Sequence, residues 1–243
     1  MNNLGIHPFV LRLRPSSVRR RPARWSLTFQ LALERWLWQC RVPADEVVKR
    51  AFDVAFSAIV LLLISPLLAL IALLIKLEDG GPVMFRQVRV GRHGCEFLMF
   101  KFRSMRPDAE LRLRELLARN QHKTGVTFKI KGDPRITCVG RWLRKFSFDE
   151  LPQFYNVLIG DMSVVGPRPP VPREVELYTL ADRRRLRVDP GITCLWQISG
   201  RAQIDFHGQV ELDVRYIESR GFWRDLGIIG KTLPAVLSGT GAY

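Results

Sequence analysis

The chain has 243 residues, of which 47% are hydrophobic, and its 38 basic and 23 acidic residues give a formal net charge of +15. This length supports one substantial globular core with one appended element and does not require two domains. The basic surplus indicates an anionic partner, without choosing between nucleic acid, anionic lipid and phosphorylated substrates. The four cysteines form no CxxC pair and the four histidines are far apart, which indicates neither a disulfide framework nor a zinc site.

Residues 1–47 form a basic N-terminal extension. Within it, the segment 26–40, "SLTFQLALERWLWQC", places Phe29, Leu33, Trp36 and Cys40 along one helical stripe. Tryptophan side chains suit the headgroup region of a bilayer, so this segment could be an interfacial helix. A helix that packs on its own domain is an equally good interpretation.

Residues 54–75, "VAFSAIVLLLISPLLALIALLI", form an apolar run between Asp53 and Lys76. About 20 apolar residues suffice to cross a bilayer as a helix, whereas buried core helices seldom reach this length without a polar residue. The run begins too late in the chain and is too long for a secretory signal. Ser65 and Pro66 lie in its middle, where a proline bends or breaks a helix.

The charges that flank this run predict its course in the membrane. Residues 1–50 hold ten Lys/Arg against three acidic residues, and residues 76–106 hold seven against three. Basic flanks favour the cytoplasmic side of a membrane. A helix that crosses the membrane fully would place one of these two basic flanks on the opposite side, in either orientation. We therefore prefer a re-entrant membrane helix-hairpin over residues 48–80, broken at Ser65-Pro66, which returns to the side it entered and makes the protein monotopic. A straight span with a tolerated kink is the alternative.

Residues 81–243 predict a mixed α/β domain of short elements, rich in α-helix. Two strands are expected around the turn at 91–94, followed by a helix from Asp108. Further helices are expected in the segments 134–146, from Ser147 to a stop at Gly160, 172–188, 209–220 and 226–237, with an irregular or short-strand segment at 190–201. No GxGxxG or Walker A motif is present, so the common nucleotide-binding folds are not indicated.

The acidic residues in the stretch 144–170, "RKFSFDELPQFYNVLIGDMSVVGPRPP", have a structural and a chemical interpretation. Ser147 and Glu150 fit a helix-capping box, which explains Glu150 at least as well as catalysis does. Asp149 is not needed by that box. The helix dipole and nearby Arg144 and Lys145 are expected to keep it ionised, and an ionised aspartate can attack phosphorus or bind Mg²⁺.

Arg168 lies between two prolines, which stiffen the loop that carries it. A fixed guanidinium can offer paired hydrogen bonds to a phosphate. Acidic residues, a rigid arginine and an apolar membrane segment together suggest phosphate chemistry at a lipid surface.

Over residues 48–243 the chain resembles the bacterial sugar transferase family, the monotopic phosphoglycosyl transferases that begin polysaccharide and glycoconjugate synthesis. The resemblance rests on an ordered set of segments: "KRAFDVAFSAIVLLLISPLLALIALLIKLEDGGPVMFRQVRVG", "FLMFKFRSM", "DPRITCVGRWLRKFSFDELPQFYNVLIGDMSVVGPRP" and "PGITCLWQISGR". Residues 1–47 fall outside it, and the multi-span N-terminal region of the family's larger members has no counterpart in this sequence.

The resemblance implies transfer of a sugar 1-phosphate from a UDP-sugar to polyprenyl (undecaprenyl) phosphate, with release of UMP. It assigns Asp149 as the nucleophile that forms a covalent phosphosugar intermediate, Glu150 as its partner in acid/base work or metal placement, and Mg²⁺ as cofactor, with Asp149 as the metal-binding residue. Arg144 and Arg168 match family positions assigned to substrate phosphate or to structural support. Lys101 matches the lysine of the family's "KFRSM" segment, and all three are predicted to bind substrate phosphate. Arg201 could bind phosphate or support the fold. Asp161 is better explained as scaffold.

The implied location is the cytoplasmic face of the bacterial inner membrane, and nucleic acid is not an expected partner. The oligomeric state is open, with a homo-oligomer among the options, and the residues do not identify the sugar. Two other functions stay in view: a non-catalytic basic protein that binds a membrane surface, and a phosphohydrolase in which water replaces polyprenyl phosphate.

Overall fold

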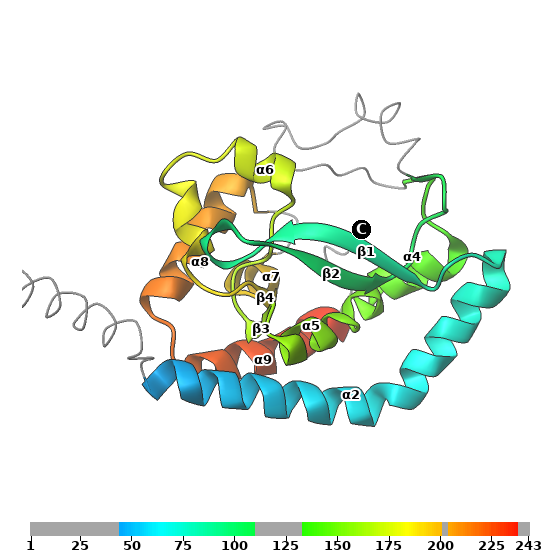
Figure 1. Ribbon diagram of the computed structural model, residues 1–243, viewed down its shortest axis with the longest axis horizontal. Helices are drawn as coiled ribbons and strands as arrows, with labels where there is room; N and C mark the ends of the chain where they lie inside the picture. The colour runs from blue at the N-terminus through cyan, green and yellow to red at the C-terminus, as the bar shows by residue number, and fades with distance from the viewer. Residues whose placement is uncertain (1–43, 110–132, 201–203, 238–243) are drawn as a thin grey trace, which may run out of the picture. The chain divides into compact units, whose positions relative to one another are not determined.

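The computed structural model of the chain describes residues 44–109, 133–200 and 204–237. Three sequence predictions fall on residues outside these ranges: residues 1–43 of the N-terminal extension with its interfacial helix, the helix expected after Asp108, and Arg201. Within the described part, short helices and strands alternate, which confirms the helix-rich mixed α/β class (Figure 1).

The apolar run lies in one long helix, α2 (Ala44–Asp79), which continues through Pro66. The predicted break is therefore wrong, although Figure 1 shows α2 as two arms that meet at an angle. Pro66 has no N–H for the carbonyl of Leu62 four residues earlier, and the hydroxyl of Ser65 donates to that oxygen at 2.9 Å instead. The lost backbone bond is thus replaced locally, so the chain bends without leaving the helix.

Within the described residues, α2 is the one helix long and apolar enough to cross a membrane. Only 11% of its most apolar window is buried, which excludes the core helix of a soluble protein as its explanation. Large apolar side chains such as Leu62, Leu63, Leu73 and Leu77 are exposed along it. These properties are compatible with a monotopic membrane protein.

Both ends of α2 contact the rest of the fold through polar groups. Near its start, Arg50 donates to the carbonyls of Val157 and Leu158 at 2.6 and 3.0 Å. At its end, Glu78 accepts from the backbone N–H of Cys138 at 2.7 Å. The two ends of the apolar helix are therefore attached to the same domain.

The predicted pair of strands is present as β1 (Met84–Val90) and β2 (Glu96–Phe102), joined by the 3-10 turn η1 (Arg92–Gly94). The strands are antiparallel, with Phe85 opposite Lys101 and Arg86 opposite Phe100. Because side chains alternate along a strand, Gln87, Arg89 and Lys101 share one face of this ribbon. Arg86 and Phe100 lie on the other face.

The predicted basic helix is α4 (Cys138–Lys145), and Thr137 caps it by accepting from the N–H of Gly140 at 2.9 Å. Gly140 packs against the backbone of Ser104, where an added Cβ would lie 2.0 Å from the carbonyl oxygen. The next predicted helix is divided into the 3-10 turn η3 (Phe148–Glu150) and α5 (Gln153–Ile159). Gly160, with φ of 101°, ends α5 as expected.

A second sheet carries the loop with Arg168. It pairs β3 (Ser163–Val165) with β4 (Gly191–Thr193) in parallel. Between these strands lie the Pro-Arg-Pro loop, α6 (Pro172–Glu176) and the 3-10 segment η4 (Asp182–Arg187), where one helical segment was expected. The chain then forms α7 (Leu195–Ser199), α8 (Phe206–Glu218) and α9 (Phe222–Leu237).

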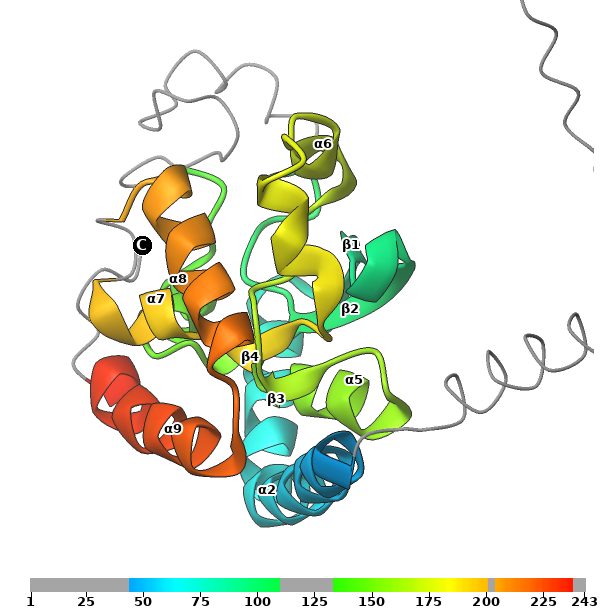
Figure 2. The same cartoon turned by 90° about the vertical axis from the view of Figure 1, so that its left-hand side faces the viewer.

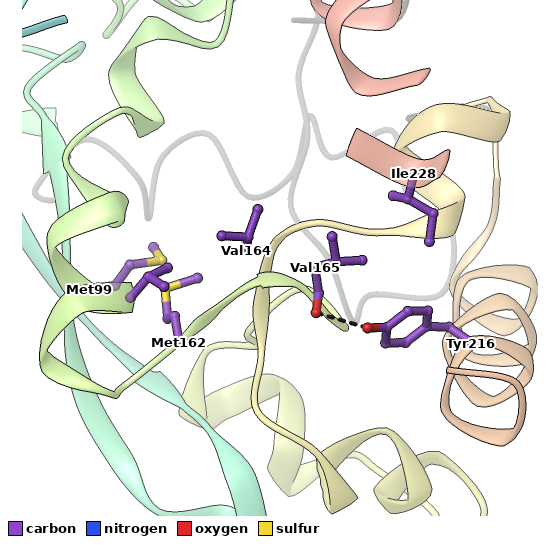
Figure 3. Close-up of a cluster of buried hydrophobic side chains, with 7 residues drawn as sticks. Met99, Met162, Val164, Val165, Tyr216 and Ile228 are labelled. Atoms are coloured by element: carbon purple, nitrogen blue, oxygen red, sulfur yellow. Dashed lines mark hydrogen bonds between the residues drawn. The ribbon is translucent and has the colours of Figure 1, made fainter. Parts of the chain in front are cut away.

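The main hydrophobic core lies where these elements meet (Figure 3), and its buried members are Met99, Val157, Met162, Val164, Val165, Tyr216 and Ile228. The hydroxyl of Tyr216 lies 3.0 Å from the carbonyl oxygen of Val165 and 2.8 Å from Asp225 Oδ1. Figure 2 shows α9 beside α2 below the β3–β4 sheet. Lys49 joins these two helices through Asp225 at 2.7 Å, so the core, the sheet and α2 form a single scaffold.

Candidate active site

A pocket of about 850 Å³ opens between the β1–β2 ribbon, η3, the Pro-Arg-Pro loop and helices α7, α8 and α9. The described residues that line it include six basic and three acidic side chains: Arg89, Lys101, Arg144, Arg168, Arg173, Arg185, Asp149, Glu150 and Glu174. A cationic cavity of this kind suits a phosphorylated ligand.

A different part of the same pocket is apolar. Its lining side chains come from α2, α5 and α9: Phe56, Val60, Phe154, Ile229, Leu233 and Val236. The pocket therefore places charged groups and an apolar wall in one cavity, and part of that wall belongs to the candidate membrane helix.

Asp149 lies in η3 and is only 8% exposed. The turn is preceded by Ser147 in the left-handed region, with φ of 56°. No residue in the described ranges donates a hydrogen bond to the Asp149 carboxylate. Burial raises the pKa of Asp149 to about 6, against the opposing effects of Lys101 and Arg144. The expectation that nearby cations favour the ionised form of Asp149 agrees with these effects, but burial, which was not expected, has the larger effect on its pKa.

Glu150 binds two cations. Its Oε1 accepts from Lys101 Nζ and from Arg168 Nη2, both at 2.8 Å. Burial alone would raise the pKa of Glu150, but Arg168 and Lys101 together bring that pKa below its usual range. The predicted capping box is absent, because the carboxylate of Glu150 bonds these side chains and the N–H of Ser147 donates to the carbonyl of Arg144.

The pKa values of Arg168 and Lys101, the two cations that Glu150 binds, are shifted in opposite directions. Glu150 raises the pKa of Arg168, so the guanidinium of the Pro-Arg-Pro loop is firmly protonated. Burial lowers the pKa of Lys101, and Glu150 partly offsets that effect. The structure thus brings together three predicted site residues from distant sequence positions, 101, 150 and 168.

The remaining predicted residues divide between site and scaffold. Arg144 lines the pocket, and no described side chain forms an ion pair or hydrogen bond with its guanidinium. Asp161 is not among the described residues that line the pocket, and its carboxylate accepts a hydrogen bond from Asn156 Nδ2 at 3.1 Å. That contact agrees with the scaffold interpretation of Asp161.

The sequence reasoning missed Arg89, Arg173 and Arg185 as lining residues. Arg185 is paired with Asp213 at 2.5 Å and donates to Tyr178 Oη at 3.0 Å, so its charge is balanced inside the wall. Nothing in the sequence around these arginines distinguishes them from other basic residues, because their place in the pocket depends on chain segments far away.

A site for Mg²⁺ can be tested against these groups. Among the described residues, no cluster of three or more histidine, cysteine, aspartate or glutamate side chains could hold a metal ion. Mg²⁺ is commonly bound by one or two carboxylates together with substrate phosphates. Asp149, which accepts no hydrogen bond from a described residue, fits this arrangement, whereas Glu150 is occupied by two cations.

Comparison with known proteins identifies the family. The pattern of the family described as bacterial sugar transferase matches residues 44–239. The chain is 53% identical over 197 residues to the galactosyl transferase CpsE of Streptococcus agalactiae serotype III (strain NEM316), a match that covers 81% of this chain and 43% of that protein.

Two further relatives come from other bacteria. The chain is 44% identical over 204 residues to the exopolysaccharide production protein ExoY of Rhizobium meliloti (strain 1021), covering 83% of this chain and 90% of ExoY. It is 45% identical over 203 residues to the undecaprenyl-phosphate galactose phosphotransferase of Salmonella typhimurium (strain LT2), covering 82% of this chain and 42% of that enzyme. The chain thus spans less than half of two of these relatives and most of the third. It belongs to the bacterial sugar transferase family, a family of enzymes.

Proposed function

We propose that this protein transfers a sugar 1-phosphate from a UDP-sugar to polyprenyl phosphate, such as undecaprenyl phosphate, and releases UMP. The observation that carries the proposal is the pocket itself, where a buried carboxylate without a hydrogen-bond donor lies among cations and beside an apolar wall. The charged part suits the diphosphate of the donor, and the apolar part suits the hydrocarbon chain of the acceptor. The name of the Salmonella relative, which includes undecaprenyl phosphate and galactose, supports the same reaction class.

The first step uses Asp149 as nucleophile. A carboxylate oxygen of Asp149 attacks the phosphorus that bears the sugar, a bond forms between them, and the bond from that phosphorus to the bridging oxygen breaks. UMP leaves with the electron pair of the broken bond. Few donors compete for this carboxylate, so it keeps its nucleophilicity, and nearby Lys101 and Arg144 hold the anionic substrate close to it.

The second step regenerates the carboxylate. A phosphate oxygen of the polyprenyl phosphate attacks the same phosphorus and the bond to Asp149 breaks, which leaves a polyprenyl diphosphate sugar. Two successive displacements let two anionic substrates use one cationic site in turn. Mg²⁺, held by Asp149 and the substrate phosphates, would neutralise part of the charge on the diphosphate.

Glu150 has a positioning role in this scheme. Its lowered pKa makes it a weak proton acceptor, and its contacts hold the ammonium of Lys101 and the guanidinium of Arg168 side by side. The scheme needs no proton transfer at Asp149, because both attacking groups are anionic oxygens.

We also propose that α2 enters the membrane and returns to the same side, with the catalytic domain on the cytoplasmic face of the inner membrane. The attachment of both ends of α2 to one domain, through Arg50 at the start and Glu78 at the end, supports this course. A helix with its two ends on opposite faces of a bilayer could not make both sets of contacts. The basic flanks of the apolar run favour the cytoplasmic side.

The reaction is tested by incubating purified protein with UDP-sugars, with and without polyprenyl phosphate. We expect sustained UMP release only when polyprenyl phosphate is present, and a panel of UDP-sugars identifies the sugar. Continuous release of sugar phosphate into water without the lipid would instead indicate a phosphohydrolase. Absence of any turnover with the full panel would favour a non-catalytic membrane-binding role.

A further inference from the structure

Arg89 is a cation of the pocket wall, and its hydrogen bonds within the described residues are all to neutral groups. Its Nε and Nη2 donate to the side-chain oxygen of Gln87 at 3.1 and 2.7 Å, and its Nη1 donates to the carbonyl of Pro169 at 2.8 Å. The side chain lies on the same face of the β1–β2 ribbon as Lys101, and Pro169 adjoins Arg168. The guanidinium is thus held between the ribbon and the Pro-Arg-Pro loop.

No described carboxylate lies within ion-pair distance of Arg89, which distinguishes it from three other cations of the pocket. Lys101 and Arg168 share Glu150, and Arg185 is paired with Asp213. Burial, and then the nearby charge of Arg168, lowers the pKa of Arg89 to about 10. The carboxylates of Glu174 and Glu150 partly offset this lowering, although neither pairs directly with the guanidinium, and the group is still protonated at neutral pH. The fold thus holds a positive charge here that no described carboxylate pairs directly.

The hydrogen-bonding capacity of Arg89 is also incomplete. A guanidinium has five N–H donors, and three are used by Gln87 and Pro169. Two donors remain without a partner among the described residues, on a side chain that lines the pocket. An oriented guanidinium with spare donors matches the geometry of a phosphate oxygen pair.

We propose that Arg89 binds a phosphate group of the nucleotide donor and works beside Arg168, so that two adjacent arginines engage the two adjacent phosphates of a nucleoside diphosphate. This inference rests on the proposed function and adds to it a binding residue on β1. Gln87 and the carbonyl of Pro169 are positioning groups, because their hydrogen bonds orient the guanidinium of Arg89. The ligand supplies the negative charge that the protein lacks at this position.

The alternative is that Arg89 only fixes the Pro-Arg-Pro loop. The variant Gln87→Glu separates the two roles. It keeps an oxygen acceptor for Arg89 and so preserves the link to the loop, but it gives the guanidinium a carboxylate partner. If Arg89 binds phosphate, this substitution weakens nucleotide binding. If Arg89 only holds the Pro-Arg-Pro loop in place, the ion pair that Gln87→Glu forms with Arg89 leaves nucleotide binding unchanged.

The experiment measures UDP binding by titration calorimetry with the purified full-length protein in lipid nanodiscs. We expect Gln87→Glu and Arg89→Gln each to raise the Kd for UDP by about tenfold or more, the range of a lost charge-assisted hydrogen bond. Arg89→Lys, which keeps the charge but loses the fork, should fall between them and the unmodified protein. Matched controls on the opposite face of β1 are Val88→Glu and Arg86→Gln, which change the net charge equally and should leave the Kd within about twofold.

Three outcomes would overturn the inference. One is an unchanged Kd for UDP in Gln87→Glu, and another is an equal loss in the control variants. The third is a raised KM for polyprenyl phosphate with normal UDP binding, which would place the contact on the lipid phosphate. Failure of this inference leaves covalent labelling of Asp149 intact, whereas failure of the proposed function removes that labelling or abolishes UDP binding by the unmodified protein.

Discussion

Asp149 and Glu150 are neighbours in the chain, yet their environments move their pKa values in opposite directions. Burial raises the pKa of Asp149, while Arg168 and Lys101 overcome the effect of burial at Glu150 and lower its pKa. Pairs of acidic groups that differ in this way are common at catalytic sites. This difference supports the proposed division of the pair into a nucleophile, Asp149, and a positioning group, Glu150.

The raised pKa of Asp149 predicts an acid limb in the pH profile of the transferase. A nucleophilic carboxylate must be ionised, so kcat/KM should be constant near neutral pH and fall about tenfold for each pH unit below about 6. The check is a pH–rate profile for UMP release with polyprenyl phosphate present. An acid limb centred near pH 4, the ordinary range of an aspartate, would show that burial does not control this group.

The same shift predicts that Asp149→Asn stabilises the protein. A folded-state pKa above the unfolded value means that the stabilising effect of protonation is full below about pH 4 and is lost as the pH rises through about 6. Removing the buried charge at pH 7.5 should then recover on the order of 2 kcal/mol. Thermal unfolding of both forms should show a higher Tm for Asp149→Asn at pH 7.5, with the gap closing near pH 4. A lower Tm at pH 7.5 would contradict the buried-charge account.

At the level of elements, Asn156 links the ribbon to the helix that follows the acidic pair. It is fully buried; its Oδ1 accepts from the N–H of Phe100 at 2.9 Å, and its Nδ2 donates to the carbonyl of Leu98 at 2.7 Å. The amide thus pairs the free edge of β2 as another strand would. This link sets the distance between Lys101, which follows Phe100, and Glu150, which precedes α5.

Asn156→Ala should lower the free energy of unfolding by about 3 kcal/mol, because two backbone groups of β2 lose their hydrogen-bond partner and a buried side chain is truncated. Transfer activity should fall as well, since Lys101 is then less well placed. Tyr155→Phe, an exposed position on the same helix, is the matched control and should change stability by less than about 0.5 kcal/mol. Unfolding midpoints in denaturant give the comparison. Equal midpoints for Asn156→Ala and the control would exclude this bridging role.

Elements defined by local signals were predictable, and contacts made across the fold were not. The ribbon, α4 and the stop at Gly160 follow from alternation, capping and glycine, which act within a few residues. The capping box failed because Glu150 finds Lys101 and Arg168, 49 and 18 residues away, in place of the backbone nearby. The sequence does contain the capping-box pattern, but the ionic contacts of Glu150 with Lys101 and Arg168 are stronger than a hydrogen bond to the backbone of Ser147.

The candidate site was predictable only in part, for the same reason. Lys101, Arg144, Asp149 and Arg168 were identified because they match motifs of a known family, and all four line the pocket. Arg89 was missed because its significance depends on Pro169, 80 residues away, and on the lack of a direct ion pair with any described carboxylate. Neither property is visible in the sequence around it.

On the scale of the whole molecule, the course proposed for the bent helix α2 would connect the membrane and the candidate active site. Phe56 and Val60 of this helix line the pocket, and Arg50 and Glu78 attach its two ends to the domain. The apolar substrate could then pass from the bilayer to the pocket along a surface that the membrane helix itself provides.

This arrangement predicts that both ends of α2 and the catalytic domain are on one side of the membrane. Single cysteines at the exposed positions Asp45 and Glu211, with the other cysteines replaced by serine, should react with a membrane-impermeant maleimide only in inverted vesicles. The double variant Ser65→Ala with Pro66→Ala, which is expected to straighten the helix, should make Asp45→Cys reactive from the outside. Reaction of Asp45→Cys in intact cells without that double variant would exclude the same-side course.

The central claim is that Asp149 forms a covalent bond to the phosphosugar, and mass spectrometry of the protein tests it directly. The protein is incubated with a UDP-sugar without polyprenyl phosphate, quenched and digested. We predict an added mass of one sugar phosphate on Asp149, lost on addition of polyprenyl phosphate and absent in Asp149→Asn. An adduct on another residue, or full turnover by Asp149→Asn, would contradict the account.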